Sequence, residues 1–296
     1  MTQPKRQKRA VSGWLGLDKP YDMTSTQAVG KVRWLFGAEK AGHAGTLDPL
    51  ATGILPIALG EATKTVPAVQ DGNKVYRFTV QWGAATTTDD AEGEITGTAA
   101  AEGVTVEAID TAVATLTGEI LQVPPAVSAI KVGGQRAYKL TRAGAAPELK
   151  ARPVTVYEFT VTDVRPDGDL LDFDATVRCS SGTYIRALAR DLGATLGSGG
   201  HLTRLRRTRV GGYRIEDART LEQLAGRFEV LPLAQAAAAA FPSRTLTEDE
   251  ARRLAHGGRL SPTGVDEPTA AYAPDGTLIA LVTEESGQAR PLVVFA

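Results

Sequence analysis

The chain has 296 residues, of which 43% are hydrophobic and 23% are charged, so it can bury a sizeable core and is neither a low-complexity nor a fibrous protein. Its one cysteine, Cys179, excludes an intramolecular disulfide, which fits a reducing cytoplasm, and its three histidines lie too far apart in the sequence to suggest a metal site. No apolar run approaches the roughly 20 residues that span a bilayer, so we expect no membrane segment.

The formal net charge of −1 hides a segregation of charges along the chain. Every charged residue from Asp89 to Glu119 is acidic, whereas Lys5 to Arg9 and Leu202 to Arg209 are strongly basic. Such basic segments either form a solvated surface or hold phosphates. We expect residues 1–10 to be a flexible basic tail with an auxiliary role.

The first predicted elements are a strand and a helix. Gly13 to Leu17 predicts a short strand that leads into an Asp18-Lys19-Pro20 turn. Thr24 or Ser25 can then cap a helix, because apolar residues follow at helical spacing and Gly37 can end it.

The segment Ala41 to Thr65 contains the first candidate for chemistry. Asp48 stands between leucines that are typical of an interior, and Pro49 stiffens the backbone just after it. A carboxylate held in this way can act as nucleophile, general base or electrostatic stabiliser. Asp-Pro is also ordinary turn chemistry, and a lone His43 is often structural, so both interpretations stay open at this point.

The middle of the chain alternates strands, loops and one helix. Ala62 to Val69 can continue helically, and Lys74 to Trp82 alternates as a half-buried strand in which Tyr76 would ordinarily be a packing residue. Thr86 to Glu94 predicts a polar loop, and Val106 to Leu116 an amphipathic helix closed by a glycine. Lys139 to Pro153 shows no periodicity and suggests a mobile loop.

Two strands, Val154 to Val164 and Leu170 to Cys179, are predicted on either side of a turn at residues 165–168. A cap at Gly182-Thr183 then predicts a helix with Arg186 near its start, a position where an arginine is usually solvated.

A break is expected around Leu231 to Ser243, where an alanine run ends in Phe241-Pro242. Beyond it, Thr247 to Leu254 predicts a capped helix, and Ala270 to Ala296 predicts strands joined by turns. We therefore expect a large domain followed by a small one.

Two long motifs carry a resemblance to a known family. The first, G-x-L-x-L-D-K-P-x-x-x-T-S, covers Gly13 to Ser25, and the second, A-G-H-A-G-T-L-D-P-L-A-T-G-I-L-P-I-A-L-G-E-A-T-K, covers Ala41 to Lys64. Together they resemble the TruB family of tRNA pseudouridine synthases, which isomerise uridine 55 in the T-arm loop of tRNA. Further similar blocks are K-x-Y, P-P-x-x-S-A-x-K-x-x-G-x-x-x-Y, G-T-Y-I-R and G-x-H-x-x-x-L-R-R, whereas the family's T-x-T-x-D-x-x-G pattern is only partly matched.

The resemblance implies an α/β (α+β) fold. Residues 11–231 would form a pseudouridine synthase catalytic domain with a mixed or antiparallel sheet and a thumb-like RNA-binding loop at about residues 124–153. Residues 242–296 would form a small PUA-like RNA-binding domain. The implied partner is the T-arm stem-loop of tRNA, with no cofactor, metal or obligate protein partner, and the protein would be a monomer.

The resemblance also implies roles for individual residues. Asp48 would be the nucleophile or C1′ stabiliser of a flipped-out uridine, Arg186 would pair with this carboxylate, and Tyr76 would stack on the base and help to remove a proton. The implied substrate-binding residues are His43, Tyr76, Tyr184 and Leu205, and the weaker RNA contacts are Lys19, Lys131, Arg206 and Arg207. Lys19 could instead pair with a carboxylate near its turn.

Three questions stay open at this stage. The residues do not choose between a covalent acylal and a glycal intermediate. A non-catalytic RNA-binding or RNA-folding protein would keep the fold and the basic face. A carboxylate-dependent glycoside or nucleoside hydrolase would usually need a second carboxylate, and the motif region offers one clear candidate.

Overall fold

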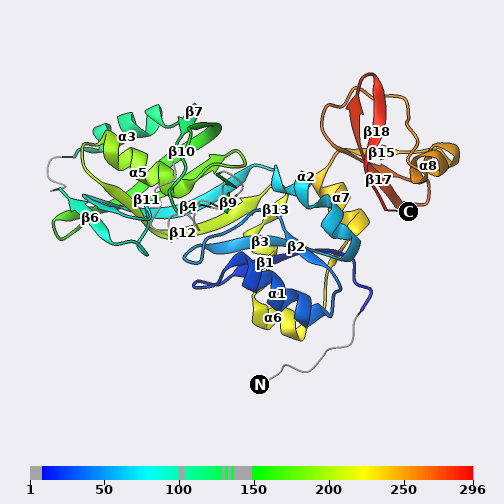
Figure 1. Ribbon diagram of the computed structural model, residues 1–296, viewed down its shortest axis with the longest axis horizontal. Helices are drawn as coiled ribbons and strands as arrows, with labels where there is room; N and C mark the ends of the chain where they lie inside the picture. Colours follow the sequence, from blue (N-terminus) through cyan, green and yellow to red (C-terminus); the bar gives the residue numbers. More distant parts are fainter. Residues whose placement is uncertain (1–8, 100–103, 129–130, 133–134, 137–148, 296) are drawn as a thin grey trace. The chain divides into compact units, whose positions relative to one another are not determined.

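The computed structural model describes residues 9–99, 104–128, 131–132, 135–136 and 149–295 (Figure 1). The chain divides into two compact units, Met1–Gly72 with Arg209–Ala296, and Asn73–Thr208. Within the described ranges, every helix is too short or too polar to cross a bilayer.

The first unit is built on antiparallel strands. β1 (Gly13–Lys19) pairs with β3 (Thr52–Leu59) on one side and with the short β14 (Leu231–Pro232) on the other, and β2 (Ala41–His43) pairs with β3. Every residue of β3 except Thr52 is buried, as its continuous apolar sequence predicts.

Helix α1 (Ser25–Phe36) confirms the predicted helix and identifies its cap as Thr24. The Thr24 side chain accepts from the Gln27 amide while the Gln27 side chain accepts from the Thr24 amide, which forms a capping box. Gly37 ends the helix in the left-handed region, at φ 64°.

One local prediction for the first unit needs correction, and one helix of this unit was not predicted. The predicted helix at Ala62 to Val69 is a 3₁₀ turn, η1 (Gly60–Thr65), followed by α2 (Val66–Gln70). The alanine run at the expected break forms α7 (Leu233–Ala240), whose Ala236 and Ala237 pack into buried clusters, and the break itself stays a prediction. The remaining short elements are β13 (Tyr213–Arg214), η2 (Ile215–Asp217) and α6 (Leu221–Gly226).

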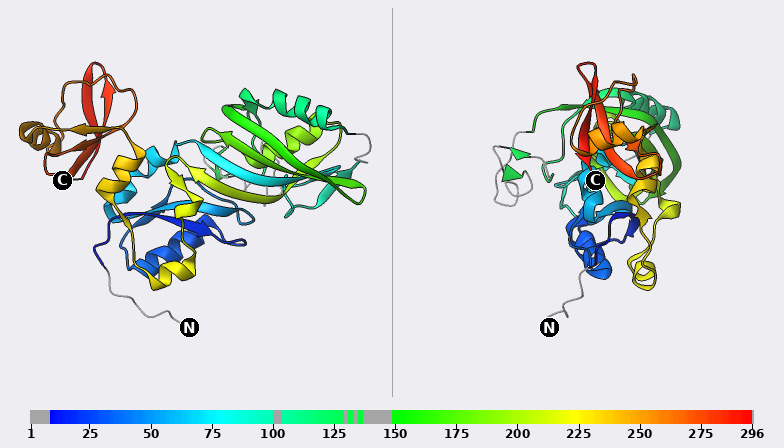
Figure 2. Two further views of the ribbon diagram at one scale, coloured as in Figure 1. Left: turned by 180° about the vertical axis from the view of Figure 1, so that it is seen from behind. Right: turned by 90° about the vertical axis from the view of Figure 1, so that its right-hand side faces the viewer.

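The second unit is an antiparallel sheet with helices on one face, as Figures 1 and 2 show. Its strands lie in the order β12 (Gly200–Val210), β4 (Lys74–Trp82), β11 (Leu170–Cys179), β10 (Arg152–Asp167) and β7 (Gly118–Gln122). Its helices are α3 (Val106–Thr115) and α5 (Ile185–Thr195). The bounds of β4 and β11 match the predicted strands. β10 runs three residues beyond its predicted end, so the turn falls at Gly168, whose φ is 62°.

α5 lies close to the start of β12 because two glycines face each other there. A Cβ atom at Gly193 would collide with the backbone of Gly200. This close approach lets the C-terminal part of α5 pack against the start of β12.

Two short hairpins complete the second unit. β5 (Ala84–Thr86) pairs with β6 (Ile95–Thr98), and β8 (Lys131–Val132) pairs with β9 (Gln135–Arg136). The predicted polar loop therefore joins β5 to β6. Of the predicted mobile loop, Lys139 to Pro153, residues 139–148 lie outside the described residues, whereas Arg152 and Pro153 belong to strand β10 and correct the prediction there.

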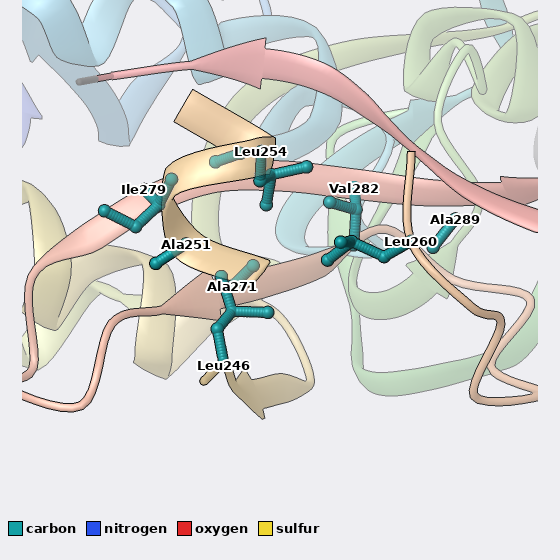
Figure 3. Close-up of a cluster of buried hydrophobic side chains, with 9 residues drawn as sticks. Leu246, Ala251, Leu254, Leu260, Ala271, Ile279, Val282 and Ala289 are labelled. Atoms are coloured by element: carbon teal, nitrogen blue, oxygen red, sulfur yellow. The ribbon is translucent and has the colours of Figure 1, made fainter. Parts of the chain in front are cut away.

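The C-terminal residues of the first unit form a module with its own apolar core (Figure 3). β15 (Ser243–Thr245) runs parallel to β16 (Thr269–Tyr272), whereas β17 (Leu278–Glu285) and β18 (Gln288–Val294) continue the sheet antiparallel. Helix α8 (Glu248–Ala255), capped by Thr247, packs Ala251 and Leu254 against this sheet. The predicted helix and strands of this region are confirmed, as is the α+β fold class with mixed and antiparallel sheets.

Candidate active site

Asp48 lies on the loop that joins β2 to β3. Leu47 and Leu50 beside it are 4% and 3% exposed, whereas Asp48 itself is half-buried. The Ala51 amide donates to the Asp48 carbonyl at 3.1 Å, which closes a turn just after the carboxylate. The loop thus buries its leucines and leaves the Asp48 side chain partly accessible.

Ser25 fixes the backbone on one side of Asp48. Its Oγ accepts from the Leu47 amide at 2.9 Å and donates to the Leu47 carbonyl at 3.0 Å. Ser25 is 3% exposed, so both bonds lie in the interior. The residue considered as a possible helix cap instead connects α1 to the Asp48 loop.

Lys19 fixes the backbone on the other side. Its Nζ donates to the carbonyls of Pro20, Met23 and Pro49, at 2.9, 2.6 and 3.2 Å. The Asp22 amide also donates to the Pro49 carbonyl, at 3.0 Å. Lys19 has no exposed surface, so these contacts favour a supporting role over the expected contact with RNA.

His43 is the last residue of β2, opposite Ile57 of β3, and is half-buried. It belongs to the same unit as Asp48 and precedes it by five positions. The two residues therefore lie on one connected segment, β2 and the loop after it.

Tyr76, Leu205 and Tyr184 belong to the second unit. Tyr76 lies on β4 opposite Val177 and is 6% exposed, and Leu205 on β12 is 7% exposed. Tyr184 is half-buried and directly precedes α5. Its amide donates to Gln122 Oε1 at 2.8 Å and its carbonyl accepts from Gln122 Nε2 at 3.1 Å, so a buried glutamine that the sequence did not single out holds it in place.

Arg186 lies in the first turn of α5 and is 5% exposed, so it is not the solvated arginine that its position suggested. Its guanidinium donates to the carbonyls of Thr88 and Val127, each at 2.9 Å, and pairs with Asp90 Oδ2 at 3.4 Å. A buried charge needs such partners, because its desolvation is costly.

Asp90 is the residue that sequence reasoning missed, since only a loop shape was inferred for its segment. Its side chain is 3% exposed, and its Oδ1 accepts from Thr88 Oγ1 at 2.5 Å and from the Glu92 amide at 3.0 Å. The sequence signal that could have found it is the T-x-T-x-D-x-x-G pattern over residues 86–93, in which Asp90 is the specified aspartate. Nothing local connects it to an arginine 96 positions later.

The expected phosphate contacts differ in exposure. Arg207 is fully buried on β12, Arg206 is half-buried, and Arg204 on the same strand is exposed. Only a side chain that reaches the surface can meet an RNA backbone, so β12 favours Arg204 and Arg206. Lys131 lies on β8, and the placement of its side chain is outside the described structure.

The candidate residues are divided between the two units. Asp48 and His43 belong to the first, and Tyr76, Tyr184, Arg186 and Leu205 to the second. The pairing of Asp48 with Arg186 stays a prediction. In the described parts of the chain, no group of three or more His, Cys, Asp or Glu side chains is arranged to hold a metal ion.

Three family models match the chain. The TruB family pseudouridylate synthase N-terminal domain matches residues 33–185. The tRNA pseudouridylate synthase B C-terminal domain matches residues 186–232, and the tRNA pseudouridine synthase II C-terminal model matches residues 241–296.

Curated relatives match over nearly their whole length. The tRNA pseudouridine synthase B of Thermobifida fusca (strain YX) is 55% identical over 290 residues, which cover 97% of this chain and 99% of the relative. The protein of the same name from Arthrobacter sp. (strain FB24) is 52% identical over 297 residues, which cover 97% of each chain.

Solved structures share the fold at lower identity. A chain of a Cbf5-Nop10-Gar1 complex has a TM-score of 0.70 and 25% identity, over 96% of this chain and 84% of that one. A chain of an H/ACA RNP bound to a substrate RNA containing 2′-deoxyuridine also has a TM-score of 0.70, with 24% identity, over 95% of this chain and 84% of that one.

Proposed function

The chain belongs to the TruB family of pseudouridine synthases, and from this premise we propose that it isomerises uridine 55 in the T-arm loop of tRNA, with Asp48 acting at C1′. The family assignment confirms the resemblance drawn from the motifs and makes the protein an isomerase that modifies tRNA. The choice of nucleotide and the role of each residue belong to the proposal.

The observation that carries the proposal is the support of the Asp48 loop. Ser25 holds the backbone before the carboxylate and Lys19 holds it after, so the side chain projects from a fixed loop while it stays partly accessible. An ordinary surface turn does not require a buried ammonium group for its support. A carboxylate that must meet a sugar carbon does require a fixed position.

The reaction replaces the N1–C1′ bond of uridine with a C5–C1′ bond. The N1–C1′ bond breaks with its electron pair leaving on uracil, and the Asp48 carboxylate stabilises or captures the positive carbon that remains. Uracil turns, and C5 bonds to C1′ while any bond between Asp48 and C1′ breaks and its electron pair returns to the carboxylate. C5 then loses its proton to a base, and N1 gains a proton. Atoms and electrons balance without an oxidant, a reductant or a carried group, so the chemistry requires no cofactor. An acylal and a glycal route both use Asp48.

The other residues take supporting roles in this proposal. A uridine stacked in its loop must be flipped out, which costs about a few kcal/mol, and stacking on Tyr76 and Tyr184 offsets this cost. Arg186 pairs with the Asp48 carboxylate and orients it, with Tyr76 aiding proton transfer. His43 fills the space left by the base, and Leu205 lines the pocket.

We also propose that the T-arm stem-loop is held by cationic side chains, among them Arg206 and Lys131, and by the C-terminal module. The protein would act as a monomer in the cytoplasm. Phosphate contacts of this kind weaken as salt rises, so the affinity for tRNA should fall steeply with salt concentration.

The test is tritium release from transcribed tRNA that carries uridine labelled at C5, with wild-type protein and Asp48→Asn. C5 loses its hydrogen when it becomes the glycosidic carbon, so release reports isomerisation directly. We expect the wild type to release label from one T-loop uridine and Asp48→Asn to release none while it still binds tRNA. Binding without release by the wild type would support an RNA-folding protein, and free uracil would support a hydrolase.

A further inference from the structure

Arg190 lies one helical turn after Arg186 on α5 and makes three contacts. Its Nη1 donates to Asp89 Oδ2 at 3.1 Å, its Nη2 donates to the Val123 carbonyl at 2.8 Å, and its Nε donates to Asp191 Oδ1 at 2.9 Å. The guanidinium thus joins α5 to two segments that are far from it in the sequence.

Asp89 has a strained backbone conformation and a mostly buried side chain. Its φ is 60°, in the left-handed region that costs a non-glycine residue free energy, and its side chain is 16% exposed. Burial raises the pKa of its carboxyl group, while Arg190 and Arg186 act in the opposite direction and Asp191 adds to the rise. Asp89 therefore sits in an unfavourable conformation and environment, and its bond to Arg190 offsets part of that cost.

The two arginines of α5 bind the same two segments. Arg186 contacts Thr88 and Asp90 on one side and Val127 on the other. Arg190 contacts Asp89, which lies between Thr88 and Asp90, and Val123, which lies four residues before Val127. Each segment is thus held at two points along α5, and a segment held at two points resists rotation more than one held at a single point.

We propose that Arg190 and Asp89 form a positioning pair that orients the acceptors of Arg186. The pair goes beyond the motifs, because Asp89 fills an unspecified position of the T-x-T-x-D-x-x-G pattern and Arg190 lies outside G-T-Y-I-R. It rests on the proposed role of Arg186, since the pair acts on the reaction only through that side chain.

The test compares Arg190→Met, Asp89→Asn and the double variant with the full-length wild type. The readouts are the single-turnover rate of tritium release with enzyme in excess and, separately, the Kd for tRNA. We expect each single variant to lower the rate about tenfold and to change the Kd by less than about twofold. The rate of the double variant should also be about tenfold lower than that of the wild type, rather than a hundredfold lower, because both changes remove the same interaction.

Arg190→Lys separates positioning from folding. Lysine keeps the charge beside Asp89, so this variant should recover the rate to within about threefold of the wild type. It also keeps the test informative if Arg190→Met does not fold. A rate for Arg190→Lys as low as that of Arg190→Met would overturn the pair, as would an effect on the Kd alone.

A matched control is Arg178→Met. It removes an arginine on the same sheet that pairs with Glu158 at 2.9 Å, and the two side chains are 37% and 67% exposed. It should keep the wild-type rate. Arg186→Met distinguishes the two proposals. If Arg186→Met releases tritium at the wild-type rate, the proposed role of Arg186 is refuted. If Arg186→Met is slow but Arg190→Met and Asp89→Asn have rates within about twofold of the wild type, only the positioning pair is refuted.

Discussion

The Asp48 loop of the first unit is held through its backbone, whereas Arg186 of the second unit is held through its own side chain. Ser25 and Lys19 bond to the amide and carbonyl groups of Leu47 and Pro49, so their hold does not depend on the side chains of the loop. Arg186 instead depends on a buried carboxylate and on two carbonyls that other segments supply.

This difference predicts that substitutions in the two supports have different effects. Backbone support makes a loop stiff whatever its side chains are, so a change in that support should alter stability and activity together. Charge pairing fixes one side chain in a low-dielectric site, so a change in a partner should alter the orientation and charge of that side chain most directly. We expect the effect of a substitution to decrease in the order Asp90, Lys19, Ser25 and Gln122.

Asp90→Asn should have the largest effect. The amide keeps the size of the side chain but turns a donor toward Arg186 and leaves a buried cation without its carboxylate. Breaking such a pair costs about 3–5 kcal/mol of stability, and we expect the single-turnover rate to fall about a hundredfold. Chemical denaturation and tritium release measure the two quantities. Asp174→Asn, which affects a more exposed ion pair with Arg165, is the matched control and should stay near wild type.

Lys19→Met should come next, with a loss of about 2–3 kcal/mol in the free energy of unfolding. The change keeps the length of the side chain but removes the donor shared by three carbonyls, and unmet buried acceptors are costly. Activity should fall as well, because the Pro49 carbonyl is one of the three. Lys31→Met, on the exposed side of α1, provides the comparison. Equal stability of the two variants would show that Lys19 is not a support.

Ser25→Ala should lower the free energy of unfolding by about 1–2 kcal/mol, since it leaves the amide and the carbonyl of Leu47 without their partner. Its neighbour Thr26→Ala is exposed and should change stability by less than about 0.5 kcal/mol. If the Asp48 loop is held as described, Ser25→Ala should lower kcat more than it raises KM. If Ser25→Ala raised KM and left kcat unchanged, Ser25 would not be holding the Asp48 carboxylate in a fixed position.

Gln122→Met should have the smallest effect of the four, a loss of about 1 kcal/mol in the free energy of unfolding. It removes two bonds to the backbone of Tyr184, but Tyr184 is half-buried, so water can replace part of what is lost. We expect weaker binding of the T-arm with a nearly unchanged melting temperature. A melting temperature lowered by more than about 5 °C would indicate that Gln122 holds the fold rather than the pocket.

Local patterns predicted much of the secondary structure. The bounds of β4 and β11 and the caps of α1 and α8 agree with the structure, because alternation and capping depend on residues within one or two turns. The errors occurred where tertiary contacts decide. The alanine run of α7 has no amphipathic pattern to mark the buried side of a helix, although alanine favours helix, and only the structure shows that Ala236 and Ala237 are the buried residues.

The candidate site shows a similar division. The motifs carried Asp48, Tyr76 and Arg186 as a resemblance, but Ser25 and Asp90 did not appear as candidates, and Lys19 appeared only as a possible RNA contact or partner of a carboxylate. Ser25 lies 22 positions from Leu47, and Arg186 lies 98 positions from the Thr88 carbonyl. A sequence shows that a residue can donate or accept, but not which distant group the fold will bring within 3 Å.

The sequence by itself therefore determined the family, much of the secondary structure and the expectation of a stiff loop around one aspartate. These depend on residue types and short spacings that are visible along the chain. Only the tertiary structure decided that Lys19 is buried, that Asp90 pairs with Arg186 and that Arg190 binds Asp89. The reason is physical, because burial and ion pairing are properties of the space around a side chain, and that space is filled by segments far away in the sequence.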